Sequence, residues 1–323
     1  MSDAYTIQFD QLGGPEVLVR RALELAEPLP GNVRIRQSAI GLNFIDTYFR
    51  TGLYPAKLPF TAGMEGAGIV DAVGEGVSHL KVGDRVGHLS AGAYATHITV
   101  PADRVVVLPD HVSDSEAAAV LLKGLTAWML LFEIRTIVAG DTVLVWAPVG
   151  GVGSLLLPWA KSLGARVIAV TSSEVKAKRA SELGADETIV GYDNVVAQVR
   201  EATGGQGVDV ALDSVGKISA DASLKSLKPK GWFITYGNAS GAVEPLPPAR
   251  LAQGGSLIMT RPTLFNYIDT EENLQRGADA LFGALKAGVT SVEIGQTYAL
   301  DDVAAAHTAL EAGDTTGATV LIP

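Results

Sequence analysis

The segment 143–153, with the sequence VLVWAPVGGVG, decides which fold the chain is expected to adopt. Its first residues are apolar enough for a buried strand, and its glycines lead into a helical pattern over 154–163. That order of strand, glycine turn and helix is typical of a dinucleotide-binding site. Gly150 would let the backbone approach a pyrophosphate, and Gly153 would let the helix pack closely on the strand, with the phosphates at the helix N-terminus.

This turn differs from the usual fingerprint, because Pro148 stands where the first glycine is expected. An ordinary tight turn is therefore the alternative interpretation of Gly150, Gly151 and Gly153. The neighbouring sequence favours the cofactor interpretation, since a second predicted strand follows the helix at 166–170.

Beyond this segment, short apolar runs alternate with helical patterns up to about residue 236. Such alternation requires crossover connections, and the apolar runs are continuous, as in strands that are buried on both faces. We therefore predict an α/β fold with a parallel, doubly wound sheet of the Rossmann type. The predicted strands after 142–147 are Arg166–Val170, Glu187–Val190, Val208–Asp213 and Trp232–Tyr236, with helices over 154–163 and 175–183.

The chain before this region has the short strands and turns of a β-rich barrel, at Tyr5–Phe9, Val33–Ala39, Gly66–Val73 and His97–Val100. A helical region follows, in which Ser113 or Asp114 would cap a helix over 116–122 and Gly124 would separate it from a second helix over 125–132. We expect a domain boundary here. The last predicted elements are two helices, Glu271–Lys286 and Asp301–Glu311, and the strand Ala318–Ile322.

Composition narrows the range of functions. The net charge of −10 makes a broad nucleic-acid-binding surface unexpected, although a local basic pocket is still allowed. The absence of cysteine excludes disulfides, thiolate metal sites and cysteine nucleophiles. Neither a signal peptide nor an apolar run of membrane-spanning length is expected from the sequence, so we predict a cytoplasmic protein without membrane association.

The end of the second predicted strand indicates which dinucleotide is bound. A site that prefers NAD usually carries a carboxylate there for the ribose 2′-hydroxyl, and this chain has Ser172 and Ser173 instead. Lys176, Lys178 and Arg179 follow on the next helix, so a 2′-phosphate would find hydroxyls and positive charge. The sequence favours NADPH. The alternatives are a simple serine cap and a solvated helix face, and Glu174 is an opposing charge.

Two further glycine turns follow strands of the series, at Asp213–Gly216 and Tyr236–Asn238. Ligands in doubly wound sheets bind at the carboxyl ends of the strands, so both turns are candidate ligand contacts. Plain turn chemistry would explain them equally well.

Taken together, these motifs resemble the medium-chain dehydrogenase/reductase superfamily, and closely its zinc-independent quinone oxidoreductases related to zeta-crystallin. The resemblance covers the whole length through segments such as 13–18 (GGPEVL), 41–48 (GLNFIDTY), 52–55 (GLYP), 123–126 (KGLT) and 147–153, and it continues at 236–241 and 260–262. It implies a GroES-like β-barrel domain over 1–122 and 266–323, with a Rossmann NADPH-binding domain over 123–265.

The same resemblance argues against a metal site. Zinc alcohol dehydrogenases of the superfamily have a cysteine ligand where this chain has Asn43, and the histidine of their Gly-His-Glu motif is replaced by Met64. A neutral amide and a thioether do not form a zinc site. We therefore expect no metal and no metal polarisation of a substrate carbonyl.

Site residues are implied by the resemblance position by position. Asn43, Asp46, Tyr54 and Thr126 are the candidate catalytic residues, although Asp46 could instead orient a backbone loop and Tyr54 could serve only packing. The implied cofactor contacts are Asn43, Phe44, Tyr48, Thr126, Gly150, Gly151, Val152, Gly153, Ser172, Ser173, Lys176, Tyr192, Ser214, Tyr236, Gly237, Asn238, Thr263, Leu264 and Phe265.

The expected activity is hydride transfer from NADPH to a quinone. Without a metal, an acceptor that spreads the incoming charge over a conjugated system is favoured. An enoyl or 2-alkenal reductase is the nearest alternative, and an inactive crystallin-like or RNA-binding protein is an alternative of another class. The apolar segment Ser256–Thr260 is expected at a sheet edge, and by resemblance it would join two chains into a homodimer.

Overall fold

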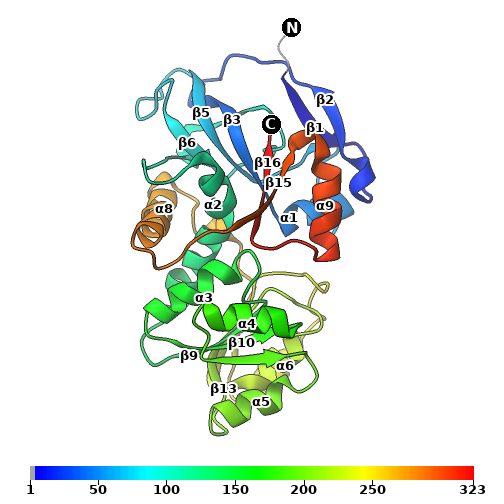
Figure 1. Ribbon diagram of the computed structural model, residues 1–323, viewed down its shortest axis with the longest axis vertical. Helices are drawn as coiled ribbons and strands as arrows, with labels where there is room; N and C mark the ends of the chain where they lie inside the picture. Colours follow the sequence, from blue (N-terminus) through cyan, green and yellow to red (C-terminus); the bar gives the residue numbers. More distant parts are fainter. Residues whose placement is uncertain (1–3) are drawn as a thin grey trace. The chain divides into compact units, whose positions relative to one another are not determined.

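The computed structural model describes residues 4–323 and divides them into two compact units (Figure 1). The first unit contains residues up to Leu125, together with Thr270–Phe282 and Val292–Pro323. The second contains Thr126–Asp269 and Gly283–Ser291. The limits given above for the two domains remain a prediction.

The second unit is built on one six-stranded sheet whose neighbouring strands are all parallel, in the order β11-β10-β9-β12-β13-β14. This order confirms the predicted doubly wound sheet, because the chain moves outward from β9 in one direction and then in the other. The strands are β9 (Thr142–Trp146), β10 (Arg166–Thr171), β11 (Glu187–Val190), β12 (Val208–Asp213), β13 (Leu227–Thr235) and β14 (Ile258–Thr260). The helices of this region are α3 (Gly153–Ser162), α4 (Glu174–Glu182), α5 (Val195–Ala202), α6 (Ala220–Ser226) and α7 (Pro248–Gln253).

Continuous apolar runs form these strands because both faces of the sheet are covered. Val143 and Leu144 are neighbours on β9 and point to opposite faces, yet both are fully buried. On the face of Leu144, residues of α5 and α6 such as Val199 and Leu224 complete the core. The strand β14 lies at one end of the sheet, as expected for the segment Ser256–Thr260.

The first unit is rich in β-structure. Its larger sheet has the order β15-β16-β3-β5-β6-β8, with β7 paired to β3, and a smaller sheet has the order β2-β1-β4. Because β16 pairs with β3, the end of the chain returns to this unit. The strands are β1 (Tyr5–Phe9), β2 (Val19–Ala22), β3 (Asn32–Leu42), β4 (Phe60–Thr61), β5 (Glu65–Val73), β6 (Arg85–His88), β7 (His97–Pro101), β8 (Val105–Val107), β15 (Ile294–Ala299) and β16 (Ala318–Ile322). Short 3-10 turns occur at Pro15–Val17, Ala102–Arg104, Leu264–Asn266 and Leu300–Asp302.

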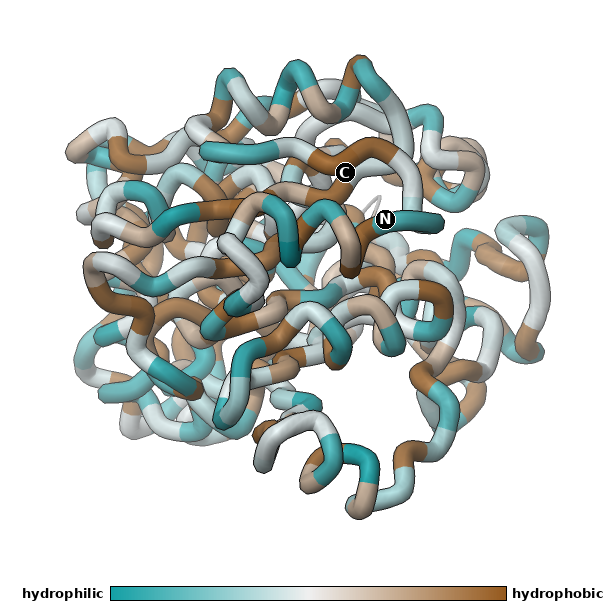
Figure 2. Tube along the Cα trace, turned by 90° about the horizontal axis from the view of Figure 1, so that it is seen from below, coloured by the Kyte–Doolittle hydropathy of each residue, from teal (hydrophilic) through white to brown (hydrophobic). Residues whose placement is uncertain are grey.

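Three more helices belong wholly or partly to the first unit. The helix α1 (Phe44–Thr51) follows β3 directly and contacts α9 (Val303–Ala312) (Figure 1). The helix α8 (Glu271–Lys286) has the bounds that the sequence predicted. Hydrophilic and hydrophobic stretches alternate along the trace (Figure 2).

The predicted break at Gly124 is wrong. A single helix, α2 (Asp114–Trp128), runs through this position and continues as a π-helical stretch over Met129–Glu133. Gly124 is needed for packing, because a Cβ there would come within 2.4 Å of the Leu281 side chain on α8. The predicted cap is present at Ser113, whose hydroxyl accepts from the Glu116 amide at 3.2 Å.

This helix also corrects the expectation about membrane-spanning length. Over Asp114–Glu133 it has the length and apolar composition that a membrane span would need. However, 78% of its most apolar window is buried inside the protein. Its composition is therefore that of a core helix.

Candidate functional site

The glycine turn lies at the carboxyl end of β9, beside the point where the sheet order reverses. Ala147 opens it in the left-handed region, with φ at 51°. At Gly153 a Cβ would lie 2.3 Å from the Ala147 carbonyl oxygen and 2.8 Å from the backbone of Pro148. Only glycine fits there, which agrees with the prediction that Gly153 lets the helix pack closely on the strand. At Gly150 the nearest atom would be 3.3 Å away.

The first turn of α3 has no side-chain cap at Val152, its N-cap residue. Amide groups at an uncapped helix start can donate to a phosphate, and the helix dipole favours the same charge. The residues of this turn therefore fit the pyrophosphate of a dinucleotide.

At the end of β10, Ser173 is the N-cap residue of α4, and its Oγ accepts from the Lys176 amide at 3.4 Å. The alternative interpretation of Ser173 as a helix cap is thus correct as far as it goes, and Ser172 beside it is exposed. The Lys176 side chain is also exposed. Glu174, the opposing charge, lies exposed on the same first turn.

Tyr192 follows β11 and packs its ring against Trp146, with 5.6 Å between the ring centroids. Burial raises the pKa of Tyr192, while a hydrogen bond with Ser172 lowers it. The ends of three neighbouring strands thus bring together Trp146, Ser172 and Tyr192. That Ser172 and Tyr192 contact the cofactor stays a prediction.

The turn after β12 is organised by Asp213, which is fully buried. Its carboxylate accepts from the amides of Val215 and Gly216 at 2.8 and 3.0 Å, and from the hydroxyls of Ser219 and Ser223 at 2.8 and 2.9 Å. Burial raises the pKa of Asp213, and these four bonds oppose that shift. Asp213 therefore shapes the turn that carries Ser214.

The turn after β13 packs against the turn after β12 through their backbones. A Cβ at Gly237 would lie 2.2 Å from the Ser214 carbonyl oxygen, and Gly216 has a φ of 93°. Tyr236 and Asn238 flank this contact, and burial raises the pKa of Tyr236. Further along, Thr263 is the N-cap of the short turn that contains buried Leu264, followed by Phe265.

In the first unit, Asn43 and Asp46 form the start of α1. The Asp46 carboxylate accepts from the Asn43 backbone amide at 2.9 Å, and the Asp46 amide donates to the Asn43 carbonyl oxygen at 3.1 Å. Asp46 is 1% exposed. These contacts match the second role considered for Asp46, which is to orient the backbone at this loop.

The Asn43 side chain contacts a buried ion pair. Its Nδ2 donates to Glu65 Oε1 at 2.7 Å, and the Lys123 ammonium donates to the same oxygen at 3.1 Å. The other oxygen of Glu65 accepts from the Leu122 amide at 2.7 Å. Gly41 makes room for this cluster, because a Cβ there would lie 2.3 Å from Glu65 Oε1.

A second buried chain of hydrogen bonds links α1 to α9. The Tyr94 hydroxyl donates to Asp46 at 3.0 Å and lies 3.0 Å from His307 Nε2. Because the single hydroxyl proton goes to Asp46, His307 must donate from Nε2 to the Tyr94 oxygen. Burial raises the pKa of Asp46 to about 7 and lowers that of His307 to about 3.

The remaining predicted residues of the first unit form an aromatic group. Tyr54 packs edge-on against Tyr48 and Phe49, with ring-centroid distances of 5.3 and 5.8 Å. The rings of Tyr48 and Phe44 are tilted to each other, with 6.5 Å between their centroids. Phe44 is 41% exposed. Thr126, which is half-buried, begins the second unit. Whether these residues contact a ligand stays a prediction.

Sequence reasoning assigned no role to Glu65, Lys123, Tyr94 or His307. Glu65 follows Met64 directly and Lys123 begins the segment 123–126, but nothing in the sequence places their charges beside Asn43. Tyr94 and His307 are 213 residues apart, and no local pattern relates them.

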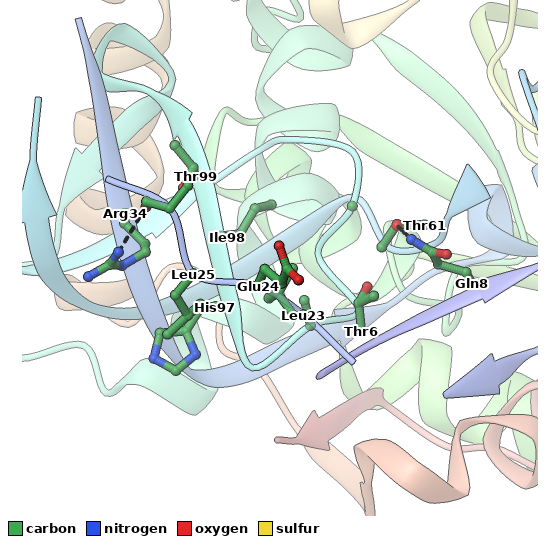
Figure 3. A pocket seen from close by; sticks show the side chains of 13 residues that line it. Thr6, Gln8, Leu23, Glu24, Leu25, Arg34, Thr61, His97, Ile98 and Thr99 are labelled. Carbon is green, nitrogen blue, oxygen red and sulfur yellow. Dashed lines mark hydrogen bonds between the residues drawn. The ribbon is translucent and has the colours of Figure 1, made fainter. Parts of the chain in front are cut away.

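A surface pocket of about 230 Å³ opens in the first unit, lined by residues of β1, β3 and β7 and by the segment 23–26 (Figure 3). It includes Gln8, Thr61, Arg34 and His97, and none of the predicted site residues. Arg34 is already paired with Asp71 at 2.8 Å.

Within residues 4–323, no group of three or more His, Asp or Glu side chains is placed to hold a metal ion. At the two positions where zinc enzymes of the superfamily have ligands, this chain has the buried thioether of Met64 and the side-chain amide of Asn43, which already donates to Glu65. These donors do not fit zinc.

Comparison with known proteins agrees with this geometry. Residues 29–110 match the family described as alcohol dehydrogenase GroES-like domain, and residues 151–276 match the zinc-binding dehydrogenase family. A quinone oxidoreductase from Pseudomonas aeruginosa is 48% identical, covering 99% of this chain and 100% of that protein. A 2-haloacrylate reductase from a Burkholderia species is 40% identical and covers 96% of each chain.

Among solved structures, Escherichia coli quinone oxidoreductase complexed with NADPH superimposes with a TM-score of 0.96 at 41% identity, covering 99% of this chain and 100% of that one. The fold, the glycine turn and these matches define an oxidoreductase of the medium-chain dehydrogenase/reductase superfamily. Within that superfamily, the chain belongs to the quinone oxidoreductase family.

Proposed function

We propose that this protein is an NADPH-dependent quinone oxidoreductase that works without a metal. The observation that carries the proposal is the uncapped glycine turn at the end of β9, where only glycine fits at position 153. NADPH, when bound, supplies the hydride, and the protein aligns the acceptor, excludes water and offers hydrogen bonds. Relatives named quinone oxidoreductases over their full length support the acceptor class.

The second candidate function is reduction of an electron-poor alkene, such as an enone, a 2-alkenal or an enoyl compound. A relative named 2-haloacrylate reductase, 40% identical, supports it, because a haloacrylate is an electron-poor alkene. Both reactions place hydride on a conjugated system, so the same site residues serve either one.

The deciding experiment follows NADPH oxidation by the purified protein with quinones, 2-alkenals, 2-haloacrylates and enoyl thioesters at matched concentrations. We expect the largest kcat/KM with a quinone. A larger value with an alkene would favour the second candidate. NADPH binding with no oxidation by any acceptor would instead indicate an inactive binding protein.

The residue assignments belong to the same proposal. Asn43 and Thr126 would donate hydrogen bonds to the acceptor or the nicotinamide, and Tyr54 would position the acceptor. Asp46, buried in the cap of α1, would act by holding Asn43 in place. In the second unit, Ser172, Ser173 and Lys176 would bind the 2′-phosphate, since two hydroxyls and one exposed ammonium stand where a carboxylate would exclude it.

Two further assignments complete the proposal. The strand β14 at the end of the sheet supports a homodimer formed through Ser256–Thr260, which light scattering at micromolar protein concentration would test. A monomer there would contradict it. We also propose a cytoplasmic location, where NADPH is available to the enzyme.

A further inference from the structure

The buried cluster around Glu65 holds two hydrogen-bond donors side by side. Asn43 Nδ2 and Lys123 Nζ both donate to the same oxygen of Glu65, at 2.7 and 3.1 Å. Glu65 is fully buried, whereas Asn43 and Lys123 each keep 7% of their surface exposed. Glu65 therefore has no exposed surface, while the two residues that donate to it each keep a small exposed fraction.

Lys123 has more hydrogen-bonding capacity than Glu65 uses. An ammonium carries three N–H groups, and Glu65 is its one partner among residues 4–323. Glu65 already receives N–H bonds from Asn43 and from the Leu122 amide. Lys123 therefore neutralises a carboxylate that already has two other donors. Its ammonium also keeps N–H groups that Glu65 does not use.

The location of this charge is informative. Asn43 and Met64 occupy the positions at which zinc alcohol dehydrogenases resembling this chain have metal ligands, and Glu65 follows Met64 directly. In those enzymes a metal cation would polarise a substrate oxygen at that place. Here the cation in contact with the same segment is the Lys123 ammonium.

We propose that Lys123, assisted by Asn43, binds the carbonyl oxygen of the hydride acceptor and stabilises the negative charge that reduction places on it. The inference rests on the proposed function. Hydride adds to the conjugated system of the acceptor, a C=C or C=O π bond breaks, and the electron pair moves to the oxygen. The ammonium and the amide hold that oxyanion until a proton arrives from water. A fixed donor at a developing oxyanion is commonly worth about 10²-fold to 10³-fold in rate.

The test compares the wild-type protein with Lys123→Met across a series of substituted benzoquinones. We expect kcat to fall about 10²-fold or more, and the loss to be larger for methyl-substituted quinones, whose reduced oxygen is more basic, than for chloro-substituted ones. The dissociation constant of NADPH, measured by tryptophan quenching, should stay within about twofold of the wild-type value. A loss of equal size across the series would overturn the inference.

A double variant, Glu65→Gln with Lys123→Met, separates this role from simple neutralisation of Glu65. Removing both charges leaves no uncompensated buried carboxylate. If Lys123 only neutralises Glu65, the double variant recovers the wild-type dependence on the quinone, and the inference is wrong. If Lys123 binds the oxyanion, the steep dependence persists.

Arg50→Met provides the matched control, because Arg50 is a buried cation of the same unit, 1% exposed and paired with Glu311 at 2.5 Å. We expect it to lower stability without changing the dependence on the quinone. A wild-type protein that reduces no quinone would contradict the proposed function itself. That result is distinct from an active wild type whose Lys123 variant loses rate uniformly.

Discussion

At the scale of single residues, the protonation state of Asp46 is expected to change near neutral pH. Its carboxylate accepts from the Asn43 amide and the Tyr94 hydroxyl, while its other oxygen has no hydrogen-bond partner within residues 4–323. Burial is the largest effect on this group and raises its pKa to about 7. The folded protein therefore holds a proton on Asp46 between about pH 4 and pH 7 that the unfolded chain releases.

The free energy of unfolding should depend on pH because the pKa of Asp46 differs between the folded and unfolded protein. Because the folded pKa of Asp46 is raised, its contribution is full below about pH 4 and is lost as the pH rises to about 7. Asp46→Asn removes the titration, so its free energy of unfolding relative to wild type should rise by up to about 4 kcal/mol from pH 4 to pH 8. Urea denaturation at several pH values measures this.

Asp84→Asn is the control for that experiment. Hydrogen bonds and charge from Lys81 lower the pKa of Asp84, so its effect on stability changes only below about pH 4. Its relative stability should stay flat from pH 5 to pH 8. A flat result for Asp46→Asn as well would mean that Asp46 is ionised in the folded protein throughout this range.

Two glycines of one turn should respond differently to substitution. Gly153→Ala forces a Cβ against backbone atoms of Ala147 and Pro148, and we expect it to cost about 1 to 3 kcal/mol of stability. Gly150→Ala meets its nearest atom at 3.3 Å, so stability should change less while NADPH affinity falls. Thermal unfolding and NADPH titration of both variants test this. Equal losses of stability would refute the separate roles.

At the scale of elements, α2 and α8 offer a matched pair of helix glycines. A Cβ at Gly124 would lie 2.4 Å from Leu281, whereas at Gly283 it would meet no atom within 4 Å. We expect Gly283→Ala to stabilise the protein by about 0.5 to 1 kcal/mol, and Gly124→Ala to destabilise it by about 1 to 3 kcal/mol. Urea unfolding distinguishes them. Stabilisation by both variants would show that Leu281 moves aside at little cost.

The helices α2 and α8 also show where prediction of elements from the sequence succeeds and where it fails. The bounds of α8 were predicted correctly because its helical pattern repeats over several turns. Those of β12 were predicted correctly because its residues form one apolar run that ends in a turn. Gly124 was interpreted as a break because glycine weakens helices locally. Its actual cause is a contact with Leu281, 157 positions away, which no local pattern contains.

At the scale of the whole molecule, the choice of cofactor can be tested at one helix. Lys176 and Lys178 are both exposed on α4, but they are two positions apart and therefore face different sides. We expect Lys176→Ala to weaken NADPH binding about tenfold and to leave NADH binding unchanged. Lys178→Ala is the control and should change neither. Tighter binding of NADH than NADPH by the wild type would contradict the assignment.

The sequence was sufficient to predict the fold and the glycine turn, and insufficient to predict the buried hydrogen-bond clusters of the first unit. The turn lies within eleven consecutive residues, 143–153, so its strand, glycines and helix start can be recognised together. The cluster of Asn43, Glu65 and Lys123 joins three distant segments, and the contact of Tyr94 with His307 joins two more. Such contacts exist only after the chain has folded.

The ion pair between Lys123 and Glu65 also bears on the durability of the protein. Quinones and enones alkylate free amines and thiols, and an enzyme that binds them is exposed to covalent inactivation by its own substrate. An ammonium paired with a carboxylate at 3.1 Å has no lone pair to add to such an electrophile. Since the chain also contains no cysteine, it has no thiol that such an electrophile could alkylate. The protein should therefore retain activity through prolonged turnover with reactive quinones.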